Sequence, residues 1–474
     1  MVLPGATPSP EPVQLEPLPQ PGARVSMGTP GKTTSGVFLL DYAGLGIPGA
    51  LYPLDGRTGA GLAGFKPIEV GHAARFYPAP TGNLIAARST AGIYLLDARD
   101  WSVTFVTYES VSDWWSPFWS PDSRFLFNIS REAENQNLER IDVATGSKDT
   151  VASLGDWWPV AARFHPDGRT LFVLGMNSSD PRTNLLDGDP FLVALDPFTG
   201  AENGRVVLPG LVVGQRRESN AGRTWYGQYF TDIAVSLDGR RVFVPHPESE
   251  SVTVIDAKSM TRERTIELAA TKRPWRRALD GMTGWFVTRA VAKGGPVSRV
   301  QAQLSPDGRF LYVAGARDVG CDGPPSCEEG RPLGLRVIDT ESLKVVHREP
   351  GISSFVVSPD GRTLAGWAGG WWGPEATPNG DYVRHGDGVK VVDAREPRVR
   401  LHLLPGEPVQ TAAIAPNGNV LVAIPGPGLA SAMRNQGKCA EACYYLRLFE
   451  PARGELTGER LLYSGIFELF TQGD

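Results

Sequence analysis

The stretch Ser305-Pro306-Asp307-Gly308-Arg309-Phe310-Leu311 decides the fold, because the chain repeats it. An Asp-Gly pair supplies the positive φ of a tight turn, and the flanking apolar residues alternate as they do in paired strands. Four further copies lie at 120–126, 165–171, 236–242 and 358–364, with weaker ones near 81–83 and 417–419. The sequence therefore predicts a chain built almost entirely of β-hairpins.

A second hairpin follows each of these turns, as in LRVIDTESLKVVH from Leu335, so that one repeat contains four strands. This pairing of an SPDG-R turn with a V-x-V-I-D strand resembles the YVTN-type, WD40-like β-propellers. The resemblance implies an all-β propeller of four-stranded blades. It implies little about function, because related propellers include enzymes, cofactor carriers and interaction scaffolds.

The two ends of the chain indicate how the ring closes. Seven complete sets of four strands fit between about Ala73 and Gly465. The tail 465–474 resembles the first strand of a set, and residues 36–65 resemble the other three. We therefore predict an eighth blade in which the C-terminal strand pairs with three N-terminal strands, which removes open sheet edges. Seven blades with an additional N-terminal hairpin is the alternative.

Residues 1–34 are rich in proline and are expected to form a disordered tether, and residues 35–474 are expected to form a single propeller domain. We hypothesise that an anchor or signal peptide once preceded Met1; an ordinary flexible terminus is the alternative. No stretch approaches the ~20 apolar residues that span a bilayer, so no membrane span is expected. With 47 basic and 52 acidic residues the net charge is -5, and nucleic acid is not an expected partner.

The four cysteines form two close pairs in Gly-rich and Ala-rich loops: Cys321 with Cys327, and Cys439 with Cys443. This grouping favours two local disulfides and an extracytoplasmic location, whether secreted, periplasmic or at the cell surface. A zinc site and free thiols are the alternatives.

The long loops of the repeats all fall on one side of the predicted ring, and binding residues are usually placed on such loops. Tryptophans with nearby charged residues gather there, and they are suited to stack on a sugar, an aromatic ligand or a protein partner. The alternative is that these rings pack between neighbouring blades. The candidate ligand-binding residues are Asp113, Trp114, Trp115, Asp156, Trp157, Trp158, Trp225, Tyr226, Trp275, Arg276, Trp371 and Trp372.

No catalytic constellation stands out: the six histidines are scattered, and no G-x-S-x-G elbow with its own domain fits into the chain. The sequence thus favours a non-catalytic scaffold, without metal or cofactor, that binds a protein, glycan or small ligand on the long-loop face. The alternative is a metal- or cofactor-dependent enzyme, lactonase-like or quinoprotein dehydrogenase-like. It would recruit carboxylates at the channel mouth. These are Asp113, Asp156, Asp187, Asp189, Asp381 and Asp387.

Overall fold

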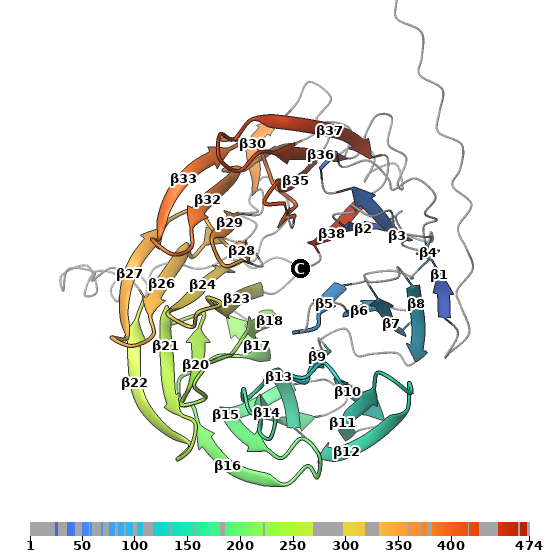
Figure 1. The fold of residues 1–474 in the computed structure, drawn as a ribbon. Coiled ribbons are helices and arrows are strands. Elements are labelled where there is room, and N and C mark those ends of the chain that lie inside the picture. Colours follow the sequence, from blue (N-terminus) through green and yellow to red (C-terminus); the bar gives the residue numbers. More distant parts are fainter. Residues whose placement is uncertain are drawn as a thin grey trace, which may run out of the picture.

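All regular elements among the described residues of the computed structural model are β-strands, arranged as a ring of sheets about a central axis (Figure 1). The all-β class and the β-propeller fold are therefore confirmed. No helix in these ranges has the length and apolar character that crossing a membrane requires. The described residues are 24–26, 36–42, 50–55, 57–58, 68–69, 75–80, 84–89, 92–97, 102–107, 117–132, 135–155, 157–180, 185–220, 223–268, 297–317, 331–358, 360–368, 371–376, 382–415, 417–425, 444–462 and 465–471.

Seven blades of four strands follow one another in chain order, numbered here from blade 1 to blade 7. Each blade is an antiparallel meander whose first strand is innermost in the ring (Figure 1). Blade 1 contains β5 (Arg75–Pro78), β6 (Leu84–Ser89), β7 (Gly92–Asp97) and β8 (Ser102–Thr107). Blade 2 contains β9 (Phe118–Trp119), β10 (Phe125–Glu132), β11 (Asn135–Asp142) and β12 (Lys148–Gly155). Blade 3 contains β13 (Trp157–Phe164), β14 (Leu171–Asp180), β15 (Leu185–Leu195) and β16 (Glu202–Val207).

The remaining four blades repeat this arrangement, and blade 5 contains one additional short strand. Blade 4 contains β19 (Ala234–Val235), β20 (Arg241–His246), β21 (Ser251–Asp256) and β22 (Thr261–Glu267). Blade 5 contains β23 (Val297–Leu304), β24 (Phe310–Arg317), β26 (Leu335–Asp339) and β27 (Lys344–Glu349), with β25 (Arg331–Pro332) beside β24. Blade 6 contains β28 (Ser354–Val357), β29 (Thr363–Trp367), β32 (Val389–Asp393) and β33 (Arg398–Leu403). Blade 7 contains β34 (Thr411–Ile414), β35 (Val420–Pro425), β36 (Tyr444–Phe449) and β37 (Leu456–Leu462).

Both ends of the chain meet in one further sheet, the closing sheet. It contains β38 (Gly465–Thr471), β2 (Gly36–Tyr42), β3 (Ala50–Asp55) and β4 (Ile68–Glu69), in that order. β38 runs antiparallel to β2, from Val37 opposite Thr471 to Tyr42 opposite Gly465. It also contacts β34 of blade 7 and β5 of blade 1. The predicted pairing of the C-terminal strand with an N-terminal strand is therefore present. The ring has seven blades of consecutive strands, which matches the seven-blade alternative and not the predicted eight blades.

Part of the predicted tether belongs to the sheet structure. β1 (Arg24–Ser26) pairs antiparallel with β8, the outermost strand of blade 1, with Val25 opposite Val103. These three residues correct the expectation of disorder over 1–34. The rest of that segment lies outside the described residues.

The repeated turn is held by its serine and its aspartate. In blade 5, Ser305 Oγ donates to Asp307 Oδ1 at 2.6 Å and accepts from the Phe310 N–H at 2.9 Å. Asp307 Oδ1 also accepts from the Arg309 N–H at 3.1 Å, and Gly308 has φ 72°. Glycine is required here for a second reason. A Cβ on it would lie 2.8 Å from Leu237 of blade 4, so these turns pack edge to edge around the ring.

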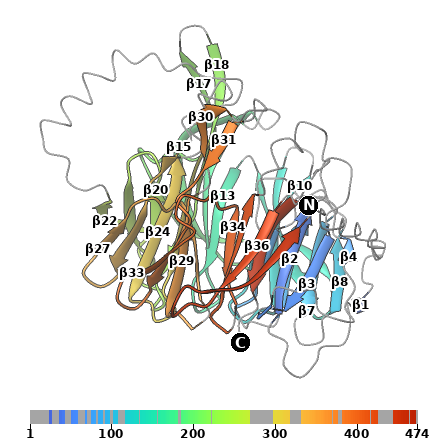
Figure 2. The ribbon, with the colours of Figure 1, turned by 90° about the horizontal axis from the view of Figure 1, so that it is seen from above.

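Two hairpins inserted into the long connections project from one face of the ring (Figure 2). They are β17 (Gly214–Asn220) with β18 (Arg223–Thr231), and β30 (Trp371–Ala376) with β31 (Tyr382–His385). β18 continues along β23 in parallel, with Thr231 opposite Val300, and so joins the projecting hairpin to blade 5. The prediction that long insertions share one face agrees with this arrangement.

Candidate functional site in the central channel

A cavity of about 380 Å³ lies among the innermost strands of blades 3, 4 and 5. This volume falls within the range of small-molecule sites in proteins. All its lining residues lie within five positions before a tight turn, so it occupies the part of the channel toward the short turns. It is lined by Arg163, Phe164, Asp232, Ile233, Ala234, Val235, Gln301, Ala302, Gln303 and Leu304.

The alternation of the inner strands places polar groups along this cavity. In β23, Val300 and Ala302 are buried, whereas Gln303 is exposed and Gln301 half-buried. Successive side chains of a strand point to opposite sides, so the buried residues pack between blades 4 and 5 while the glutamines stay at the channel wall. In β13, Arg163 is likewise exposed, whereas the preceding Ala162 is buried.

An ion pair between Arg163 and Asp232 crosses from blade 3 to blade 4. Arg163 Nη2 lies 2.8 Å from Asp232 Oδ1 and donates to Oδ2 at 2.9 Å. Asp232 Oδ1 also accepts from the Ile233 N–H at 2.9 Å. The Asp232 N–H donates to Val300 O at 3.1 Å, which fixes its backbone against blade 5. Asp232 thus links three blades at the channel wall, through its carboxyl group and its backbone N–H.

Burial raises the pKa of Asp232 above the usual value of an aspartic acid, because desolvation penalises the carboxylate. The positive charge of Arg163 and the N–H groups of Ile233 and Ala302 oppose this rise. The guanidinium is the more accessible partner: the Arg163 side chain is 46% exposed and that of Asp232 is 20% exposed. A carboxyl with a shifted pKa beside an accessible cation is a typical feature of a functional site.

The two glutamines of β23 differ in their bonding. Gln301 Nε2 donates to Phe355 O at 3.1 Å, so this side chain links blade 5 to blade 6. Gln303 is exposed, and among the described residues its amide has no hydrogen-bond partner. Gln301 therefore holds the wall together, while Gln303 is free to bind a ligand.

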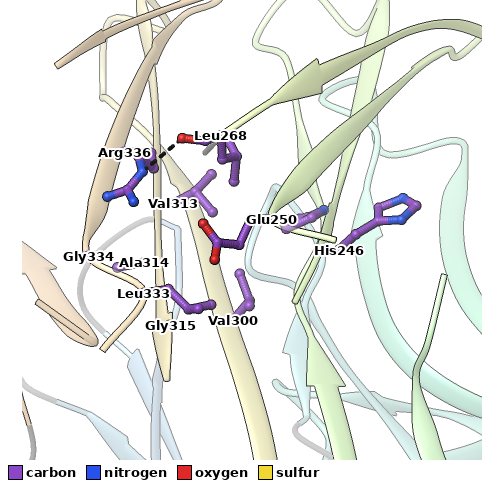
Figure 3. A pocket seen from close by; sticks show the side chains of 11 residues that line it. His246, Glu250, Leu268, Val300, Val313, Ala314, Gly315, Leu333, Gly334 and Arg336 are labelled. Carbon is purple, nitrogen blue, oxygen red and sulfur yellow. Dashed lines mark hydrogen bonds between the residues drawn. The ribbon is translucent and has the colours of Figure 1, made fainter. Parts of the chain in front are cut away.

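A second cavity lies between the sheets of blades 4 and 5, next to the turn that joins β20 to β21 (Figure 3). Its volume of about 20 Å³ admits little more than a water molecule. Its lining is largely apolar, with Leu268, Val300 and Val313 prominent, although His246, Glu250 and Arg336 also border it. This inter-blade cavity is too small for a ligand.

Arg336 and His246 at the inter-blade cavity are bound to the protein itself. Arg336 Nε donates to Leu268 O at 3.1 Å, and burial lowers the pKa of its guanidinium. His246 Nε2 lies 2.9 Å from Thr253 Oγ1. Burial, with a contribution from Arg262, lowers the pKa of His246 to about 4, so the imidazole is neutral at pH 7.

Two of the candidate tryptophans belong to the packing between blades. Trp158 is 6% exposed and lies in the apolar cluster between blades 3 and 4. Trp157 is half-buried and packs edge-on against Phe191 at 5.1 Å, with the Arg205 guanidinium 4.4 Å from its ring centre. These positions agree with the alternative interpretation of the aromatic residues and leave little of either ring for a ligand.

Four other candidates lie on the projecting hairpins. Trp225 and Tyr226 belong to β18, opposite Glu218 and Arg217 of β17. Trp371 and Trp372 belong to β30, and Trp371 is opposite His385. The backbone thus places all four on the long-loop face, as predicted, and their part in binding stays a prediction.

The remaining candidates lie outside the described residues, so the predicted disulfides and the channel-mouth tryptophans stay predictions. These residues are Asp113, Trp114, Trp115, Asp156, Trp275, Arg276, Cys321, Cys327, Cys439 and Cys443. Within the described ranges, no group of three or more His, Cys, Asp or Glu side chains is placed to hold a metal ion.

Arg163, Asp232 and Gln303 are not among the binding residues predicted from the sequence, because those were chosen on the long-loop face. A signal for two of them was present. Arg163 and Asp232 are charged residues inside apolar inner strands or at their start, two and four positions before the tight turn. Such positions border the axis in every blade.

Comparison with known proteins supports the fold only. No protein-family model and no curated protein matches the chain. Among solved structures, dihydro-heme d1 dehydrogenase NirN in complex with DHE has a TM-score of 0.53 at 12% identity, covering 97% of this chain and 84% of that one. The periplasmic gluconolactonase PpgL of Pseudomonas aeruginosa has a TM-score of 0.47 at 17% identity, covering 78% and 95%. At these identities the likeness concerns the propeller architecture, and no YVTN family membership is shown.

Proposed function

We propose that this propeller binds a small polar molecule in the channel cavity and acts on it by acid-base chemistry. The observation that carries the proposal is the Asp232 carboxyl, with its raised pKa, in the wall of a cavity of ligand size. A carboxyl group whose pKa is raised holds its proton more firmly than an ordinary aspartate and can exchange it with a bound ligand. Arg163 supplies a cation at the same place, which is suited to bind or polarise an oxygen atom of the ligand.

This proposal moves the site from the long-loop face to the channel, and it favours the enzyme alternative over the non-catalytic scaffold. It requires neither a metal nor an organic cofactor for the roles assigned to Asp232 and Arg163. Asp232 is the candidate acid-base residue, and Arg163 with Gln303 are the candidate binding residues.

Ligand-observed NMR against a library of small sugars, acids and amides tests the proposal. The native protein is expected to bind some members, and Asp232→Asn is expected to abolish their turnover while they still bind. Asp142→Asn is the matched control, because Asp142 caps a surface turn through the Thr145 N–H at 3.0 Å. Binding that none of the channel substitutions changes would refute the site.

A second candidate function is binding of a macromolecular partner on the long-loop face. The two projecting hairpins favour it, since β17–β18 and β30–β31 both carry aromatic residues on that side of the ring (Figure 2). Deletion of residues 216–226, with a glycine link in their place, is expected to abolish capture of such a partner. Unchanged capture would eliminate this hairpin as the contact.

We also propose an extracytoplasmic location for the protein. The two close cysteine pairs are the only support for it. Mass spectrometry of the unreduced, protease-digested protein from its native source is expected to yield peptides linked between Cys321 and Cys327 and between Cys439 and Cys443. Free thiols at all four positions would remove the basis for this location.

A further inference from the structure

We infer that the ligand of the channel cavity carries a carboxylate, which binds to the outer side of the Arg163 guanidinium beside the Gln303 amide. This inference rests on the proposed function and specifies its ligand class. It follows from which hydrogen-bonding groups at the cavity are already used by the protein.

The carboxyl group at the cavity already accepts hydrogen bonds from the protein. Asp232 accepts from Arg163 Nη2 and from the Ile233 N–H, and the Ala302 N–H favours its charged form. These donors reduce the capacity of the carboxyl group to accept from hydroxyl groups of a ligand. A neutral polyol, which is usually held by carboxylate acceptors, is therefore poorly served at this position.

The guanidinium, in contrast, has donors to spare. Arg163 Nη2 donates to Asp232 and Nη1 donates to the carbonyl oxygen of Ala162 at 3.0 Å. A guanidinium has five N–H donors, and no contact within the described residues uses Nε or the second hydrogen of Nη1. With nearly half of its side chain exposed, Arg163 offers these donors to an oxygen of the ligand.

Gln303 adds a neutral donor and acceptor on the neighbouring inner strand. Both residues line the same cavity, and both are exposed to it. Unused donors with a positive charge favour an anionic oxygen group, of which a carboxylate is one. The amide can bind the hydroxyl or carbonyl group next to that carboxylate.

The test compares gluconate with sorbitol, which differ chiefly in a carboxylate against a hydroxymethyl group, by isothermal titration calorimetry of the full chain. A panel of aromatic, keto and hydroxy acids with their neutral alcohols or amides extends the comparison, and inorganic phosphate is a separate arm. Carboxylates are expected to bind at least about tenfold more tightly than their neutral counterparts. Arg163→Gln is expected to remove that preference.

Two further variants keep the test interpretable. Arg241→Gln is the matched control. Arg241 donates to the Glu263 carboxylate at 2.8 and 2.9 Å, and neither residue lines the cavity. This substitution should leave the preference for carboxylates intact. Gln303→Leu leaves the Arg163 to Asp232 pair in place and is expected to weaken carboxylate binding several-fold. It remains informative if Arg163→Gln fails to fold.

Three other outcomes would overturn the carboxylate inference, alone or together with the proposed function. Equal binding of carboxylates and neutral counterparts, with turnover that Asp232→Asn abolishes, would overturn the inference and leave the proposed function standing. Phosphate binding more tightly than every carboxylate would overturn the carboxylate assignment. Absence of any binding that depends on Arg163, Asp232 or Gln303 would overturn the inference and the proposed function together.

Discussion

The channel cavity and the inter-blade cavity share two blades but differ in size and in the state of their charged groups. The channel cavity measures about 380 Å³ and is bordered by an accessible arginine and by the Gln303 amide, which makes no hydrogen bond to the part of the chain that the structure describes. The inter-blade cavity measures about 20 Å³, and its arginine donates to the backbone of its own wall. The same residue types are thus available for ligands in one place and committed to the fold in the other.

This difference teaches that the bonding state of a polar group, more than its presence in a cavity, separates binding from structure. Substitutions at the inter-blade cavity should change the free energy of unfolding. Substitution of an accessible channel group that makes no hydrogen bond to the described residues, such as Gln303, should change ligand binding and leave that free energy nearly unaltered.

The largest expected effect is that of Leu268→Ala. Leu268 is 6% exposed and belongs to the apolar cluster between blades 4 and 5. Removal of its side chain enlarges the inter-blade cavity, and the free energy of unfolding should fall by about 2–5 kcal/mol. Urea denaturation measures the change; a loss below about 1 kcal/mol would show that the wall collapses to fill the space.

The next effect is a dependence of stability on acid pH through His246. Its pKa is about 4 in the native protein, against 6.5 for an ordinary histidine, so between these pH values the unfolded chain binds the additional proton. Stability from this group is complete above pH 6.5 and is lost as the pH falls to 4, by up to about 3 kcal/mol. His246→Gln should show a smaller loss over the same range in urea titrations, and an unchanged loss would assign it to other groups.

Asp232 should have the opposite sign. Because its native pKa is raised from 3.8, the native protein retains a proton that the unfolded chain has released. Stability from this group is therefore greatest at low pH and decreases as the pH rises from 3.8 through the raised native pKa. Asp232→Asn removes this decrease. NMR titration of the carboxyl carbon reads the pKa directly, and a value below 3.8 would contradict the acid-base role.

The smallest effect on stability is expected for Gln303→Ala. The side chain is exposed and makes no hydrogen bond to the described residues, so the free energy of unfolding should change by less than about 0.5 kcal/mol. The same substitution should weaken ligand binding. A clear loss of stability would place Gln303 among the structural groups, with Gln301.

The sequence was sufficient for the fold because one local requirement recurs along the chain. Gly168, Gly239 and Gly308 all have φ between 70° and 72°, as an Asp-Gly turn requires. The second role of the turn glycine is close contact with the preceding blade. This role could not be predicted, because it depends on how the blades pack. A Cβ on Gly239 would strike the His165 ring, which takes the place of the motif serine in blade 3 and lies 3.1 Å from Gly239 O.

The candidate site was predicted less well, because the channel wall has no local signature. Trp158 is of a residue type that is common in binding sites. The structure buries it between two sheets, and this burial follows from tertiary packing. Asp232 and Arg163 are 69 positions apart, and only the closed ring brings their side chains together. The pairing of β38 with β2 was predictable because each strand retained the pattern of its place in the repeat.

That last pairing has a consequence for how the protein is made. β2, β3 and β4 leave the ribosome early, but their inner neighbour is synthesised only with residues 465–471. At about 5–20 residues per second, they wait for tens of seconds with one strand edge unoccupied. During translation this nascent segment is a natural substrate for chaperones, and a chain halted before β38 would leave that edge permanently open to other polypeptides.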